Sequence, residues 1–234
     1  MTAGPRVDQP LSPTDRSTPR REKERAQSDR AALHDVLEAS LICHLGVVVD
    51  GVPLALPTVF AVDAEGPDEG GTVYVHGSAA SRSLVQGPDQ DVSVTMTMLD
   101  GIVLARSVFE HSMNYRSVVV LGTATPVDEP EEKLAALEAF TEKLLPGRWD
   151  EARQPTRKEL KATSVLSMPL DEASAKIRDG GPEDGDTPDA DLDVWAGYLP
   201  LVVQALEPVA DPTLRPGIPV PPGLRPYRRP GLVS

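Results

Sequence analysis

The stretch LICHLGVVV-DG-VPLALPTVFAV, residues 41–62, decides the fold that this sequence predicts. Residues 41–49 and 52–62 are rich in β-branched and other apolar residues, and Asp50-Gly51 between them is a strong hairpin signal. A second pair, Asp100-Gly101, separates strands expected at 91–99 and 102–109 and has the same interpretation. Both hairpins would pair their strands antiparallel.

The rest of the pattern adds strands and helices on either side of these hairpins. Antiparallel pairing excludes a doubly wound dinucleotide fold, and the sequence has neither GxGxxG after a strand nor a Walker phosphate loop. The predicted fold class is mainly β, a barrel of about six or seven strands with peripheral helices. The additional strands are expected at residues 72–76, 115–127 and 165–170, and the helices at 29–40, 78–86, 128–144 and 156–162.

Proline and charge divide the chain into four predicted parts. Residues 1–28 lack an apolar period and form a disordered N-terminal arm, whose charges nearly cancel and so disfavour the alternative of nucleic-acid binding. Residues 29–178 form the barrel domain. Residues 179–193, with seven acids and no bases, are an acidic, solvated linker. Residues 194–234 supply a C-terminal strand near 194–201 and a Pro-rich tail.

Composition limits the class of partner. The 234 residues carry 36 acidic and 23 basic side chains, a formal charge of −13, which argues against nucleic acid or an anionic membrane as a partner. Aromatic residues make up 4%, too few for a surface that stacks several bases. The single cysteine, Cys43, excludes an intramolecular disulfide and suits a reducing compartment. No apolar stretch is long enough to cross a membrane, so the expected location is cytoplasmic.

The segment YVHGSAASR, residues 74–82, carries the clearest chemical signal. A strand ends at a glycine and small hydroxyl residues open a helix, so free backbone N–H groups with Ser78, Ser81 and Arg82 could hold a phosphate. The alternative is an ordinary strand-to-helix turn, in which Ser78 only caps the helix and Arg82 is solvated.

Two other positions have a structural and a functional interpretation. Arg116 begins a strand expected to be buried and therefore needs a partner, either a ligand phosphate or a structural carboxylate, the commoner case. Pro57 within a strand indicates an edge or a bulge, which would leave backbone groups free to meet a flat heteroaromatic ring.

The four histidines do not form a metal site with carboxylates or Cys43 in any recognised spacing, so no metal is predicted. His44 and Cys43 are adjacent in a strand and point to opposite faces, and His44 is expected to be a core histidine. His76 has the stronger claim to contact a ligand, while His111 is an alternative donor to a ligand or a substrate. Met96 and Met98 are expected in the core.

The order of these elements resembles the flavin-nucleotide-binding proteins related to pyridoxamine 5′-phosphate oxidase, in the branch that includes the nitroimidazole-resistance proteins. That resemblance implies an FMN-binding split barrel, a homodimer with FMN in the groove between subunits. The resemblance extends over about residues 25–205. The segments in which it is found are 42–46, 57–58, 73–82, 99–101, 111–118, 131–133, 146–149 and 194–197.

The resemblance also implies the cofactor contacts. Ser81 and Arg82 correspond to phosphate-binding positions, the end of the strand lines the flavin, and Arg116 could supply additional charge. The full set that it implies is Pro57, Thr58, Val59, Val75, His76, Gly77, Ser78, Ser81, Arg82, Arg116 and Ser117. This chain lacks the oxidases' basic residues at 55–60, has Ser83 where they carry a lysine, and has no counterpart of their substrate-binding C-terminal segment. Vitamin oxidation is therefore not expected.

The sequence thus predicts an FMN-dependent oxidoreductase acting on an unidentified small molecule, with a reduced nicotinamide as donor and no assigned catalytic residue. Three alternatives remain open at this stage. The same fold could hold a deazaflavin or a haem, the protein could be a non-enzymatic flavin store or sensor, or the barrel could bind a partner with an empty pocket.

Overall fold

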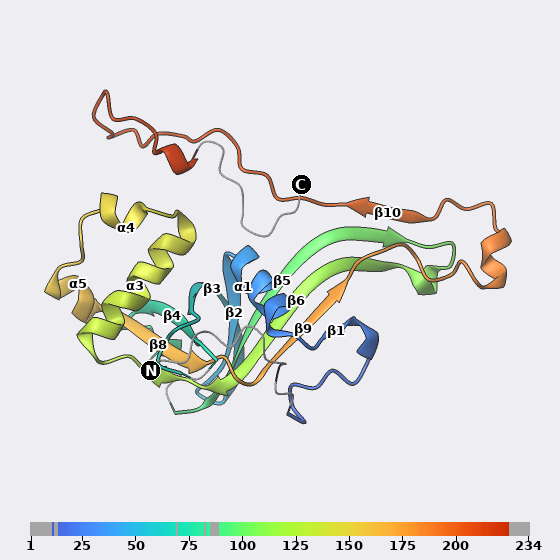
Figure 1. The fold of residues 1–234 in the computed structure, drawn as a ribbon, viewed down its shortest axis with the longest axis horizontal. Coiled ribbons are helices and arrows are strands. Elements are labelled where there is room, and N and C mark those ends of the chain that lie inside the picture. Colours follow the sequence, from blue (N-terminus) through green and yellow to red (C-terminus); the bar gives the residue numbers. More distant parts are fainter. Residues whose placement is uncertain (1–10, 12–13, 69, 82, 85–88, 225–234) are drawn as a thin grey trace.

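The computed structural model describes residues 11, 14–68, 70–81, 83–84 and 89–224, and its centre is an antiparallel sheet with helices packed beside it (Figure 1). The helices predicted at 29–40, 128–144 and 156–162 are confirmed, and α4 was not predicted. Of the helix predicted at 78–86, residues 82, 85 and 86 lie outside the described residues; Ser78 belongs to a strand, and residues 83–84 are helical. The α-helices are α1 (Arg30–Ala39), α3 (Pro130–Leu144), α4 (Arg148–Glu151) and α5 (Arg157–Ala162).

The strands follow the order β1-β9-β6-β5-β2-β3-β4-β8-β7, and β10 pairs with β5 beside this path. This path has two ends, so the predicted closure into a barrel is not confirmed, although the mainly antiparallel β class is. The strands are β1 (Ala26–Gln27), β2 (Ile42–Val49), β3 (Val52–Asp63), β4 (Thr72–Ser78), β5 (Asp91–Leu104), β6 (Ser112–Thr123), β7 (Thr125–Pro126), β8 (Thr163–Pro169), β9 (Ala173–Arg178) and β10 (Gly197–Pro200).

The first Asp-Gly pair forms the predicted hairpin. Asp50 and Gly51 have φ angles of 52° and 78°, the left-handed values that a tight two-residue hairpin turn requires, and β2 pairs with β3 from Val49↔Val52 to Ile42↔Val59.

The hairpin predicted at Asp100-Gly101 is wrong. Strand β5 runs straight through this pair, with a bulge between Leu99 and Gly101 in its pairing with β6. The glycine serves close approach rather than a turn, because a Cβ atom on Gly101 would lie 3.1 Å from the carbonyl oxygen of Leu199 in β10. The chain turns instead between β5 and β6, near residues 105–111.

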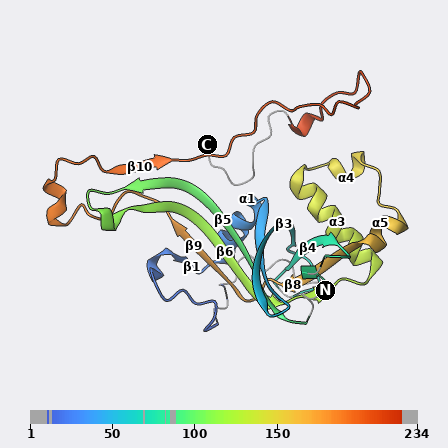
Figure 2. The same cartoon turned by 180° about the vertical axis from the view of Figure 1, so that it is seen from behind.

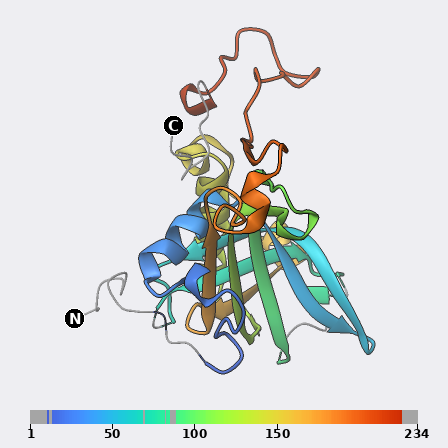
Figure 3. The same ribbon diagram turned by 90° about the vertical axis from the view of Figure 1, so that its right-hand side faces the viewer.

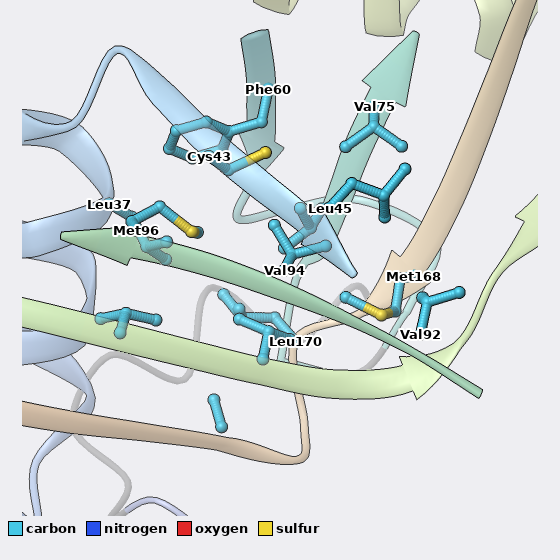
Figure 4. Close-up of a cluster of buried hydrophobic side chains, with 14 of the residues drawn as sticks. Leu37, Cys43, Leu45, Phe60, Val75, Val92, Val94, Met96, Met168 and Leu170 are labelled. Carbon is cyan, nitrogen blue, oxygen red and sulfur yellow. The ribbon is translucent and has the colours of Figure 1, made fainter. Parts of the chain in front are cut away.

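Strand β3 changes partner in its middle. Up to Val59 it pairs with β2, and from Phe60 onward it pairs with β4, beginning at Phe60↔Val75. The main hydrophobic core lies where these parts meet, and Figure 4 shows side chains from α1, β2, β3, β4, β5 and β8 gathered in it. Met96 and Met98 are buried there, as predicted.

Three local predictions require correction. The helix expected at 128–144 begins two residues later, at Pro130, after an N-cap at Glu129 whose side chain makes no capping hydrogen bond. Strand β9 was not predicted. His44 is exposed rather than in the core, although it does point to the face opposite the buried Cys43.

Residues 179–193 are more than a solvated linker. Arg178, at the end of β9, is buried and donates to Asn114 Oδ1 at 2.7 Å and to the carbonyl oxygen of Gly181 at 3.0 Å. Asp184 has 0% exposure and accepts from the backbone N–H groups of Arg106 at 2.5 Å and Ser107 at 3.3 Å. These hydrogen bonds attach residues 179–193 to the hairpin formed by β5 and β6.

Replacing Asp184 with Asn is expected to loosen this segment. Burial raises the pKa of the Asp184 carboxyl, but hydrogen bonds from Arg106 and Ser107 outweigh burial and hold the pKa below its usual value. The stabilisation is therefore complete at neutral pH and is lost as the pH falls through the lowered pKa. Amide hydrogen exchange over 179–193 should accelerate by at least about tenfold in Asp184→Asn.

The exposed Asp186 provides the matched control. Asp186→Asn makes the same chemical change two residues away and should leave exchange over 179–193 unchanged. Equal rates of amide exchange over 179–193 in Asp184→Asn and Asp186→Asn would contradict a stabilising role for the hydrogen bonds of Asp184.

The division into arm, domain, linker and tail stays a prediction. In this structure the described part of the N-terminal segment lies against the sheet: β1 pairs with β9, and Arg16 bridges Asp91 at 2.7 Å and Glu172 at 2.6 Å. Among the residues described, no helix combines the length and apolar character needed to cross a bilayer.

Candidate functional site

One face of the sheet is open, and its side chains follow from the strand register. Pro57 pairs with His44, His44 with Thr95, and Thr95 with Val119, which places these four side chains in one row across β3, β2, β5 and β6. Because directly paired residues share a face, the whole row points away from the core that holds Cys43.

The open face is built largely from small or short uncharged side chains, and Lys176 of β9, which pairs with Ser117, lies at its border. Alternation along the strands adds the residues two positions away from this row. The open face, as defined here, comprises Ile42, His44, Gly46 and Val48 of β2, Pro53, Ala55, Pro57 and Val59 of β3, Ser93, Thr95 and Thr97 of β5, and Ser117 and Val119 of β6. A flat surface of this kind suits a planar heteroaromatic ring, which needs apolar contact and a few hydroxyl groups.

His76 belongs to the same side of the sheet. Val59 and Ala61 alternate with Phe60, so they share a side; Ala61 pairs with Tyr74, and His76 lies two residues beyond Tyr74. Helix α3 covers Ala61 and Tyr74, which belong to a second core cluster with Phe140. His76 therefore lies at the border between the open face and α3.

The surroundings of His76 favour a neutral, oriented imidazole. Its ring meets the Phe140 ring edge to face, with centroids 4.3 Å apart and planes inclined by 74°. Partial burial lowers the pKa of His76 below its ordinary value, which favours the neutral form at pH 7. Within the described residues neither ring nitrogen has a hydrogen bond, so a nitrogen lone pair is available to a ligand.

Two residues of the predicted set lie on the other side of the sheet. Thr58 pairs with the buried Cys43, and Arg116 pairs with the buried Met98. Arg116 donates from Nε and Nη2 to Asp100 at 2.9 and 2.8 Å, so its partner is the structural carboxylate that the sequence left open. Pro57, Val59 and Ser117 come together on the open face, whereas Thr58 and Arg116 do not join them.

The turn after β4 has the local hydrogen bonds of a cap. Ser78 Oγ accepts from the N–H of Ala80 at 3.2 Å, and the hydroxyls of Ser81 and Ser83 are 2.9 Å apart. Val75 is buried, so only its backbone can face a ligand. A Cβ atom on Gly77 would lie 2.8 Å from Leu84 Cδ1, so a side chain there would require Leu84 to shift. The predicted Arg82 lies outside the described residues.

The other candidate ligands differ from His76 in exposure or chemistry. His111 is exposed in the connection between β5 and β6, and its Nδ1 lies 2.9 Å from the carbonyl oxygen of Ser107. Burial raises the pKa of the Cys43 thiol to about 12, which excludes a thiolate ligand at neutral pH. No cluster of three or more His, Cys, Asp or Glu side chains suited to a metal ion occurs among the described residues.

Sequence reasoning missed His44 and Thr95 as parts of the open face. The signal was present, because residues 42–49 alternate strictly and Cys43, Leu45, Val47 and Val49 form the more apolar set. Assigning that set to the core places His44 outside.

The comparisons agree with this arrangement of strands. Residues 29–177 match the model of a protein family described as pyridoxamine 5′-phosphate oxidase. The search of curated proteins found no match.

Three solved structures are informative. The flavocytochrome Anf3 from Azotobacter vinelandii is 36% identical, covers 94% of this chain and 99% of its own, and superposes with a TM-score of 0.86. The FAD and haem binding protein from Mycobacterium smegmatis is 35% identical over 86% of this chain and 96% of its own, with a TM-score of 0.78. A putative 5-nitroimidazole antibiotic resistance protein from Bacteroides thetaiotaomicron shares the fold alone, at 17% identity over 65% of this chain and 86% of its own, with a TM-score of 0.53.

Proposed function

Because this chain belongs to the pyridoxamine 5′-phosphate oxidase family, we propose that it is a flavocytochrome: a cytoplasmic homodimer that binds a flavin nucleotide and a haem and acts as an oxidoreductase. The flavin component follows the sequence prediction. The haem, which the sequence analysis left as an alternative, becomes part of the proposal through the two relatives at 35–36% identity.

The observation that carries this proposal is the extent of the likeness. The family match ends at residue 177, but the alignment with the flavocytochrome covers 94% of the chain. It therefore includes most of the residues on either side of the family match. A relative that shares only the flavin-type core would not need these additions, so their retention supports the same pair of cofactors.

The open face fits the flavin ring. Pro57 and Val59 offer apolar contact, and Ser117 and Thr97 offer hydroxyl groups. The phosphate would lie at the end of β4, with Ser78, Ser81 and Arg82 as its proposed contacts. Arg116 is already paired with Asp100 and makes a weaker candidate for this role.

His76 fits a haem iron better than the other side chains considered. An imidazole that would hold a haem iron must be neutral and held in one orientation. The lowered pKa of His76 and the packing of its ring on Phe140 provide both conditions, and it lies on the same side of the sheet as the proposed flavin contacts. When bound, a flavin exchanges one or two electrons and a haem iron exchanges one, while the protein positions them and tunes their environment.

The full-length protein, produced with a supply of haem, tests the proposal directly. The ultraviolet–visible spectrum should show flavin absorption together with an intense Soret band, and denaturation should release a flavin whose mass identifies it. FMN is the form that the sequence indicates, and FAD is the form that the mycobacterial relative binds by its description.

Each other outcome changes a defined part of the proposal. Flavin absorption without a Soret band, even after haemin is added, would remove the haem. A released deazaflavin would change the flavin class. A colourless protein that takes up neither FMN, FAD nor haemin would contradict the proposal as a whole.

Turnover separates an oxidoreductase from a flavin store or sensor. We expect steady oxidation of NADH or NADPH by the cofactor-loaded protein in the presence of an electron acceptor, above the rate without protein. Complete reduction of the bound cofactors by dithionite, together with no turnover for either nicotinamide or for a reduced ferredoxin-type donor, would favour storage or sensing.

A further inference from the structure

After β10 the chain leaves the sheet, and the described residues 201–224 do not return to it. Residues 201–224, here called the strap, start where the N–H of Leu201 donates to the carbonyl oxygen of Asp100 at 2.9 Å. In Figures 1, 2 and 3 the strap lies at the periphery, outside the sheet and the helices. Its far part, residues 208–224, lines a cavity of about 530 Å³ with Leu145, Arg148 and Glu151 at the end of α3 and in α4.

The strap is therefore held at both ends while its first part has no partner of its own. Val202, Val203 and Leu206 are 76%, 64% and 83% exposed. The strap holds these three aliphatic side chains in water, and burying them would be favourable through the hydrophobic effect. Something should cover this part of the strap.

The length of the strap indicates the size of what it covers. From Pro200 to Pro222 an extended, proline-rich chain at about 3.1 Å per residue reaches up to about 70 Å. A domain of about 150 residues has a radius of gyration of about 15 Å, and hence a diameter of roughly 40 Å. A cofactor does not need a segment of this length, whereas a whole protein domain does.

Charge indicates which domain. The chain carries a formal charge of −13, so two copies repel each other over most of their surfaces. Residues 201–206, LVVQAL, have no charge. This segment is one at which identical acidic chains can meet without repulsion, and it offers no charge by which a different acidic or basic partner would be selected.

We propose that the strap of each copy packs over the second copy of this chain, so that the two straps exchange across the homodimer. This inference rests on the homodimer in the proposed function. By two-fold symmetry both straps make the same contact, so each copy both provides a strap and receives one. The Pro-rich end of the chain is then an assembly element.

Crosslinking with isotope labels tests the exchange in the full-length protein. A photo-crosslinking amino acid is placed at Val203, and unlabelled and ¹⁵N-labelled copies are mixed under conditions that exchange subunits. Mixed-isotope crosslinked peptides are expected and would place the strap on the other copy. Crosslinks only within one isotope, in a sample shown by mass to contain mixed dimers, would overturn the inference.

A charge placed on the strap provides an independent test. Val203→Asp should raise the dimer dissociation constant by at least about tenfold in sedimentation equilibrium, because the carboxylate would be buried against the second copy. Gln204→Asp adds the same charge to a neighbouring polar position and should change the constant by less than about threefold, since no apolar contact is lost.

The outcomes separate this inference from the proposed function. A wild-type dimer that Val203→Asp leaves as tight as Gln204→Asp would overturn the strap exchange alone. A wild-type monomer at micromolar concentration would overturn the strap exchange and the homodimer, while the cofactor spectrum would still decide the flavocytochrome assignment.

Discussion

Replacing Phe60 with Ala is expected to lower the free energy of unfolding by about 3–5 kcal/mol. Phe60 is 1% exposed, and it begins the part of β3 that pairs with β4. Removing its ring would leave a cavity at the point where β3 passes from one partner to the other. This junction holds the open face in register with His76, so we also expect weaker cofactor retention.

The ring of Phe60 has a second role that Ala cannot replace. Lys143 Nζ lies 4.5 Å above its centroid and also donates to the carbonyl oxygen of Leu37 at 2.8 Å. The lysine thus links α3 to α1 across the aromatic face, and part of this cation–π attraction is lost in Phe60→Ala. The substitution therefore weakens the packing of both helices as well as the core.

Thermal and chemical unfolding of the full-length protein measure this effect. At roughly 2–4 °C per kcal/mol for a chain of this size, the melting temperature should fall by about 6–20 °C. Phe109→Ala removes the same atoms from a ring that is 88% exposed and should change the free energy of unfolding by no more than about 0.5 kcal/mol. Similar losses of unfolding free energy in Phe60→Ala and Phe109→Ala would contradict a special contribution of Phe60 to the packing where β3 changes partner.

The two Asp-Gly pairs show how far local sequence determines the fold. Asp50-Gly51 lies between two strands that pair only with each other at that point, so the intrinsic preference for a tight turn prevails. At Asp100-Gly101 long-range pairing prevails. Arg116 binds the Asp100 side chain, and β10 approaches Gly101 so closely that a Cβ atom there would crowd the carbonyl oxygen of Leu199. Neither contact has a local signal.

The candidate site divides in the same way. Alternation in residues 42–49 was enough to separate His44 from Cys43, but the direction of the core depended on α1, which packs far from the hairpin turn. That His76 shares a side with Pro57 depends on the change of partner at Phe60, which no local pattern records. The course of the strap is likewise set by contacts at its two ends rather than by its own composition.

His76→Ala is expected to abolish stable haem binding, lowering the affinity by at least about 100-fold. Loss of an outer-shell partner of a metal ligand typically costs 10–100-fold, and loss of the ligand itself costs more. The substitution should leave the fold intact, because the described structure gives His76 no hydrogen bond to another residue and its main contact is with Phe140. Titration with haemin, followed by the Soret band, measures the affinity.

His111→Ala is the matched control for this experiment. His111 lies exposed in the connection between β5 and β6, with Nδ1 against the carbonyl oxygen of Ser107, so its Nε2 is a second imidazole nitrogen that a haem iron could use. We expect His111→Ala to bind haemin as the wild type does, and free imidazole to restore the Soret band of His76→Ala by filling the space left by the ring. A normal Soret band in His76→Ala and its loss in His111→Ala would identify His111 as the haem ligand. The haem would then lie not at the border of α3 but at the end of the molecule where β10 joins the sheet.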